Sequence, residues 1–114
     1  RIGILGTALR AAEAEGFLSR ADDYASVIQG LLPDVGFDLY MAADARRDLA
    51  WWCLMRHETI GDRHHEAQRF ASDALAIARR YGYHEIAAEI DDLLERLARA
   101  RGWRTDAPFL NRSS

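Results

Sequence analysis

The chain has 114 residues, one cysteine and a formal net charge of −3, from 15 Arg and 18 Asp and Glu. A single cysteine excludes an intramolecular disulfide, which fits a reducing compartment and predicts a cytoplasmic protein. The acidic balance disfavours direct nucleic-acid binding, which depends on clustered cations, and no apolar run approaches the roughly 20 residues that a membrane span needs.

Two helices are expected before Pro33. The first covers about residues 2–15 with apolar side chains at helical spacing along one side, and Gly16 is placed to end it as a left-handed cap. The second covers about residues 19–32, where apolar residues recur at steps of three and four. Pro33 then stops this helix, because proline cannot continue the helical hydrogen bonding.

A long third helix is expected to run to Ile60, with Asp38 as its N-cap. Its later part is apolar on more than one side, because Leu49 and Trp52 face one way while Leu54 lies among the apolar residues that cover much of the remainder. Such a helix is expected in the middle of the fold, with neighbouring helices on both flanks.

Two more helices are expected in the last half of the chain. The Gly61-Asp62 pair turns the chain into a fourth helix over about residues 63–81, which a glycine follows. The fifth helix continues to Gly102, with carboxylates early and arginines late, and this order stabilises a helix by opposing its macrodipole. We therefore expect one helical domain over residues 1–102 and a C-terminal tail over residues 103–114.

The turn and the fourth helix together resemble a known family. They contain Gly61-Asp62, Ala67, Ala74-Leu75, Ile77-Ala78-Arg79 and Gly82. This pattern resembles the turn and second helix of a tetratricopeptide repeat (TPR), of a variety with longer repeats, in which small residues let paired helices approach. One extra residue between Gly61 and Ala67 departs from the family pattern. A faint internal repeat of Ala-x-x-aromatic-Ala-Ser, at residues 21–26 and 67–72, supports a repeated helix pair. The resemblance implies an all-α, right-handed stack of antiparallel helical hairpins with about five helices.

Repeats of this variety are similar to those in bacterial signalling ATPases and large transcriptional activators, where they form a sensor or docking arm. The resemblance therefore implies a non-catalytic module of a larger bacterial regulator or signalling protein, which binds a protein or peptide in a concave groove. The residues expected to line this partner-binding groove are Arg46, Arg47, Trp51, Met55, Arg56, Glu89, Asp92 and Arg96. A competing interpretation makes Trp51 and Trp52 core residues and the arginines a solvated face.

The main alternative function is self-association. A stack this short has two open ends and shows no evident polar capping helix, so a homodimer would bury surplus apolar surface. The first helix is the expected place for that contact, through Ile2, Ile4, Leu5 and Leu9.

A second alternative is a helical-bundle metal-binding protein that uses His57, His64 and His65 with Glu66. Helical metal ligands share a face when they lie three or four residues apart. Gly61 lies three residues after Glu58, and Gln68 and Arg69 lie four residues after His64 and His65, so this spacing does not favour a metal site. Cys53 lies in an apolar block with no neighbouring cation in the sequence, which predicts a buried, unreactive thiol. We therefore expect no metal, no cofactor and no catalytic residue.

Overall fold

The fold is described by a computed structural model that covers the backbone of residues 2–35, 38–59 and 63–113, and the side chains of residues 2–33, 35, 38–58 and 63–99. The helices are α1 (Ile2–Glu15), α2 (Leu18–Leu31), α3 (Leu39–Thr59), α4 (His64–Tyr81) and α5 (His84–Ser113), with a short 3-10 turn, η1 (Leu32–Val35), after α2. No strand occurs in these ranges, so the all-α prediction is confirmed for the described chain.

Local sequence signals set several helix ends as predicted. Gly16 after α1 and Gly82 after α4 have φ values of 80° and 76°, the left-handed region that glycine enters without steric cost. At the start of α3, the Asp38 carboxylate accepts a hydrogen bond of 3.0 Å from the backbone N–H of Met41, which confirms the N-cap. The expected turn at Gly61-Asp62 lies outside the described residues.

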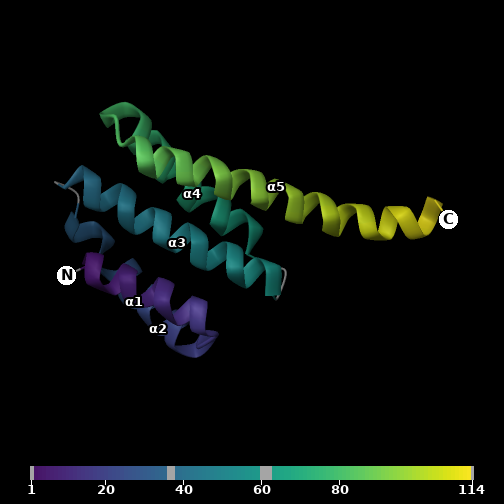
Figure 1. Ribbon diagram of the computed structural model, residues 1–114, viewed down its shortest axis with the longest axis horizontal. Coiled ribbons are helices and arrows are strands. Elements are labelled where there is room, and N and C mark those ends of the chain that lie inside the picture. The colour runs from purple at the N-terminus through teal and green to yellow at the C-terminus, as the bar shows by residue number, and fades with distance from the viewer. Residues whose placement is uncertain (1, 36–37, 60–62, 114) are drawn as a thin grey trace.

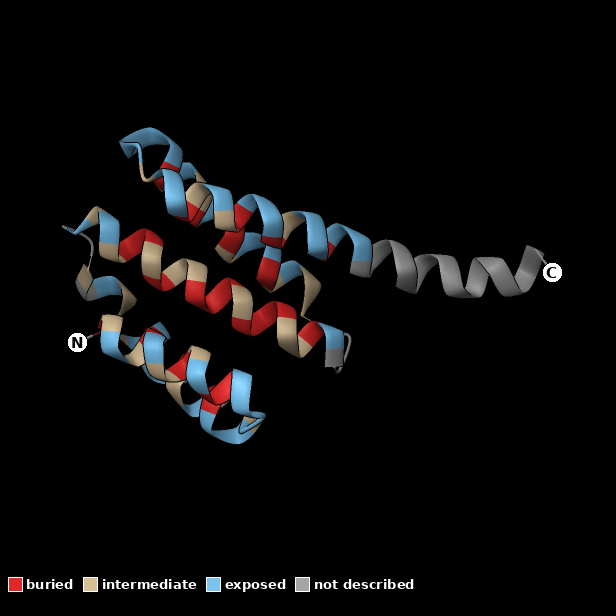
Figure 2. Ribbon diagram, viewed as in Figure 1, coloured by how far each residue is buried: buried red, intermediate tan, exposed pale blue. Residues whose placement is uncertain are grey.

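The centre of the fold is α3, which contacts α1, α2, α4 and α5. In Figure 1 it runs between the α1–α2 pair and the α4–α5 pair, and successive helices double back on one another. Figure 2 shows buried positions around much of α3, and Leu49, Ala50 and Leu54 have no exposed surface. The prediction of a central helix with neighbours on both flanks is therefore confirmed.

Small side chains line the buried side of α4. Ala67, Ala71, Ala74 and Ala78 recur at steps of four, three and four, and each is at most 1% exposed. Because an alanine projects little from the helix axis, α4 can pack closely against both α3 and α5. Ala67 and Ala74, where a close helix approach is expected, are both fully buried.

The last helix is longer than the sequence indicates. The predicted end at Gly102 is wrong, since α5 continues to Ser113. A glycine inside a helix costs only about 1 kcal/mol relative to alanine, so one glycine does not by itself end a helix. Side chains from residue 100 onwards lie outside the described set, and the division into a domain over residues 1–102 and a tail over residues 103–114 stays a prediction. Within the described residues, no helix has the length and apolar content that a bilayer span requires.

Candidate interaction face

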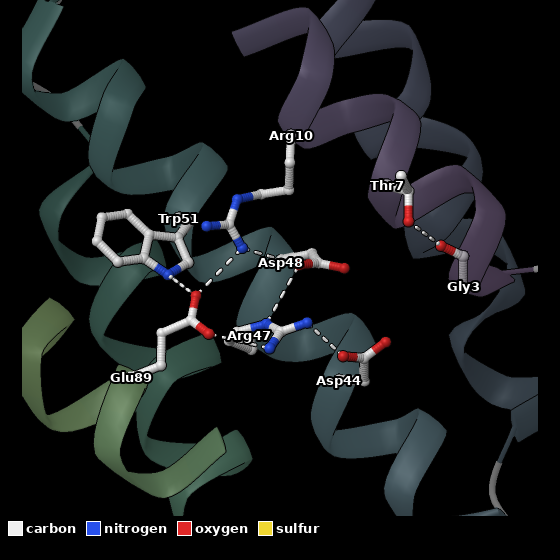
Figure 3. Close-up of polar contacts among 8 residues, drawn as sticks. All are labelled: Gly3, Thr7, Arg10, Asp44, Arg47, Asp48, Trp51 and Glu89. Atoms are coloured by element: carbon white, nitrogen blue, oxygen red, sulfur yellow. Dashed lines mark hydrogen bonds and ion pairs between the residues drawn. The ribbon is translucent and has the colours of Figure 1, made fainter. Parts of the chain in front are cut away.

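Three helices meet at the carboxylate of Glu89 on α5. It accepts hydrogen bonds from the guanidinium of Arg10 on α1 at 3.2 Å, from Arg47 on α3 at 3.0 Å, and from the indole N–H of Trp51 on α3 at 2.7 Å. Figure 3 shows all three donors turned toward this one carboxylate. Glu89 therefore fixes α5 relative to both α1 and α3.

A second carboxylate, Asp48 on α3, completes this network. It accepts hydrogen bonds from Arg10 at 3.3 Å and from Arg47 at 3.2 Å, and Arg47 also pairs with Asp44 one turn earlier. The Asp48 side chain is only 5% exposed. Burial raises the pKa of its carboxyl group, although the guanidiniums of Arg47 and Arg10 oppose that shift. Two arginines thus face three carboxylates, a local charge of −1 (2 − 3).

The aromatic residue of this surface is Trp51, which is partly exposed. The guanidinium carbons of Arg10 and Arg96 lie 5.4 Å and 5.8 Å from the centre of its ring, within the range of a cation–π contact. Arg96 also forms a two-pronged ion pair with Glu58 on α3, at 2.8 Å and 2.6 Å. Charged groups from α1 and α5 therefore surround a tryptophan of α3.

We call this surface the α1–α3–α5 face. It consists of Arg10 on α1, of Asp44, Arg47, Asp48, Trp51 and Glu58 on α3, and of Glu89, Asp92 and Arg96 on α5. Asp92 belongs to it by position, since it lies three residues after Glu89 and four before Arg96 on the same side of the helix. Asp92 is exposed and makes no ion pair with the described residues.

The structure separates Arg56 from the other predicted groove residues. Its guanidinium binds Asp22 of α2, with the Nε–Oδ1 distance at 2.9 Å, and the indole of Trp52 donates to the same carboxylate at 2.8 Å. Arg56 follows Arg47 by nine residues, and on a helix of 3.6 residues per turn that spacing places the two side chains on opposite sides. Arg56 therefore holds α3 to α2 and lies away from the α1–α3–α5 face.

The remaining predicted residues take less part in the network. Arg46 donates a hydrogen bond of 3.0 Å to the carbonyl of Ala42 in its own helix, and Met55 is partly buried. The interpretation of both tryptophans as core residues fits Trp52, which is 6% exposed, and fits Trp51 in part, since Trp51 packs against the core but stays partly exposed. The structure thus brings together Arg47, Trp51, Glu89 and Arg96 and places Asp92 beside them, whereas Arg46 and Arg56 bind other groups.

Sequence reasoning missed Arg10 and Asp48 as members of this site. A signal for them was present in the glycines of α1. A Cβ on Gly6 would overlap the Asp48 carboxylate, 3.1 Å from its Cγ, and a Cβ on Gly3 would lie 3.4 Å from the Met41 side chain. Glycine at position 6 therefore lets α1 approach α3 closely enough for Arg10 to reach Asp48.

The histidine cluster does not assemble a metal site among the described residues, where no group of three or more His, Cys, Asp or Glu side chains is placed to hold an ion. The rings of His57 and His64 meet edge to face with their centres 5.4 Å apart, and His65 is exposed. Cys53 is fully buried, as predicted, and burial raises the pKa of its thiol to about 12. Such a thiol is not ionised at neutral pH and is a poor nucleophile.

Comparison of the chain with protein-family models, with curated proteins and with solved structures found no match.

Proposed function

We propose that the chain is a non-catalytic module that binds a protein or peptide along the α1–α3–α5 face, within a larger cytoplasmic regulator or signalling protein. We further propose that its helices form a right-handed TPR-like stack of antiparallel hairpins. The order of helix contacts supports this: α1 contacts α3 and α3 contacts α5, while α2 contacts α3 and α4 contacts α5. Stacked hairpins place the first helix of each pair next to the first helix of the following pair.

The observation that carries the proposal is the partly exposed Trp51 between guanidiniums from two other helices. Tryptophan and arginine are the residues most often found to dominate binding energy at interfaces. The ion pairs of Arg47 with Asp48 and Glu89 hold the surrounding side chains in place. A surface ordered in advance loses less conformational entropy when a partner binds. The exposed carboxylate of Asp92 is left to contact the partner directly.

The experiment compares two aspartate substitutions. A partner captured on the immobilised chain is purified, and its affinity for two variants is measured. Asp92→Arg changes an exposed residue of the α1–α3–α5 face, and Asp23→Arg changes an exposed residue of α2. We expect Asp92→Arg to weaken binding about tenfold or more, equivalent to roughly 1.4 kcal/mol, and Asp23→Arg to leave it unchanged. Equal affinities of the two variants for the partner would show that the partner does not bind on the α1–α3–α5 face.

Self-association is the second candidate function, and the exposed apolar residues favour it. Among the described residues, Ile4 is the most exposed large apolar side chain at 74%, and Phe17 and Val27 in the same α1–α2 pair are about half exposed. Of the other residues expected at a dimer contact, Ile2 and Leu9 are buried. Light scattering after size exclusion should then give a mass that rises with protein concentration and returns to that of a monomer in Ile4→Arg. A monomer at every concentration contradicts this candidate.

A further inference from the structure

A cavity of about 310 Å³ lies where α3 and α5 begin, lined by Tyr40, Tyr83, His84, Glu85 and Ile86. We call it the tyrosine pocket. Its volume is at the small end of the roughly 300–1,000 Å³ typical of ligand pockets, so it suits one side chain better than an extended segment. The rings of Tyr40 and Tyr83 meet edge to face with their centres 5.1 Å apart, and Tyr40 is about half exposed.

The tyrosine pocket continues the α1–α3–α5 face. Tyr40 lies four, seven and eleven residues before Asp44, Arg47 and Trp51, so it occupies the same side of α3. Glu85 lies four and seven residues before Glu89 and Asp92 on α5 in the same way. A partner that runs along the face would therefore reach the pocket at the end where both helices begin.

The uncompensated charge of this surface is negative. The face together with Glu85 holds three arginines, Arg10, Arg47 and Arg96, and six carboxylates, Asp44, Asp48, Glu58, Glu85, Glu89 and Asp92. Its formal charge is −3 (3 − 6), and every one of its arginines is already paired within it. Glu85 and Asp92, by contrast, form no ion pair with the described residues and are exposed.

On these observations we propose that the tyrosine pocket receives an arginine side chain from a basic segment of a partner protein. Tyrosine faces attract a guanidinium. Glu85, an exposed residue of the pocket lining, supplies the opposite charge. A similar contact occurs at Tyr81, whose ring stacks on Tyr83 with the centres 6.3 Å apart and lies 5.7 Å from the guanidinium carbon of Arg80. The start of α5 carries roughly half a positive charge, which the full negative charge of Glu85 outweighs.

This inference rests on the proposed function, because it names the chemistry of the partner that the face binds. The probe is a short peptide amide of alternating arginine and glycine, and its control replaces arginine with citrulline, which has nearly the same shape but no charge. Each peptide is titrated into the isotope-labelled chain while backbone amide signals are followed by NMR. We expect the arginine peptide to shift the signals of Tyr40 and of residues 83–86, and the citrulline peptide to bind at least about fivefold more weakly.

Two substitutions in the pocket test the contacts separately. Glu85→Gln removes the charge and keeps the shape of the side chain. We expect it to lower the affinity for the arginine peptide by about two- to fivefold. Tyr40→Leu keeps an apolar side chain but removes the aromatic face, and we expect a loss of similar size. Glu95→Gln is the matched control, since Glu95 is an exposed glutamate of α5 that pairs with Arg99. This variant should bind like the unmodified chain.

The pocket assignment is overturned if both peptides bind equally, if the shifted signals map away from the pocket, or if Glu85→Gln and Tyr40→Leu both bind normally. Its failure is distinguishable from failure of the proposed function. If Asp92→Arg no longer binds the partner while Glu85→Gln and Tyr40→Leu still bind it, the partner binds on the α1–α3–α5 face. The tyrosine pocket then does not recognise an arginine.

Discussion

Replacing Glu89 should destabilise the fold, because this side chain accepts hydrogen bonds from two other helices. Glu89→Ala removes the bonds from Arg10 and Arg47 and the indole bond from Trp51. The carboxylate is 30% exposed, so each ion pair is worth roughly 0.5–1 kcal/mol at this partly solvated position, and the indole bond adds about 1 kcal/mol. Arg10 and Arg47 keep Asp48 as a partner, which limits the cost of leaving a charge unpaired.

The expected loss in the free energy of unfolding is therefore roughly 2–3 kcal/mol for Glu89→Ala, or about 8–12 °C in Tm for a domain of this size. Glu89→Gln keeps an acceptor for the Trp51 indole and should lose only about 1–2 kcal/mol. Glu95→Ala is the control, because an exposed pair with Arg99 four residues later contributes about 0.5 kcal/mol or less. Urea unfolding followed by tryptophan fluorescence measures all three, and equal stability of Glu89→Ala and Glu95→Ala would refute the network as a structural element.

The remaining predictions concern α1, the buried Glu13 and the contact between α2 and α3. Gly6→Ala should lower the Tm in thermal unfolding, because the added Cβ overlaps Asp48. Gly30→Ala in α2 has open space around the added Cβ and should be neutral or stabilising by up to about 1 kcal/mol. The reverse order of stability would contradict the close approach of α1 to α3. Burial raises the pKa of Glu13 from 4.5 to about 7. Between these pH values the folded chain binds more protons than the unfolded chain, so the free energy of unfolding should fall by roughly 2–3 kcal/mol as the pH rises through this window. Glu13→Gln should remove that loss in urea titrations at pH 5 and pH 8, and an unchanged pH dependence would argue against it. Arg56→Met should lower the free energy of unfolding by about 1 kcal/mol, because it removes the ion pair with Asp22. Affinity for the partner should not change. Weaker partner binding without a loss of stability would instead assign Arg56 to the partner-binding groove.

Helix positions followed from the sequence because they depend on local chemistry. Asp38 offers a side-chain acceptor to the first turn of α3, and Gly16 and Gly82 adopt the left-handed conformation that ends α1 and α4. These signals act within a few residues and need no knowledge of neighbouring helices. The end of α5 was misplaced because Gly102 was interpreted as a cap, while a glycine in a helix interior costs too little to be decisive.

The network of the α1–α3–α5 face could not be predicted in the same way. The contact of Arg10 with Glu89 joins residues 79 positions apart and depends on how three helices lie against one another. Helical phase alone separates Arg56 from Arg47, because a spacing of nine residues places their side chains on opposite sides of the helix. Gly6 marks the approach of α1 to α3, but the sequence does not show that Asp48 lies beside it.

Site-directed photo-crosslinking tests whether a partner binds on the α1–α3–α5 face. A photoreactive amino acid is placed at Asp92 on the α1–α3–α5 face in one variant and at Asp23 on α2 in another, both of which are exposed. We expect a partner protein or peptide to be crosslinked from position 92 and not from position 23. Crosslinking of a partner from position 23 alone would contradict it.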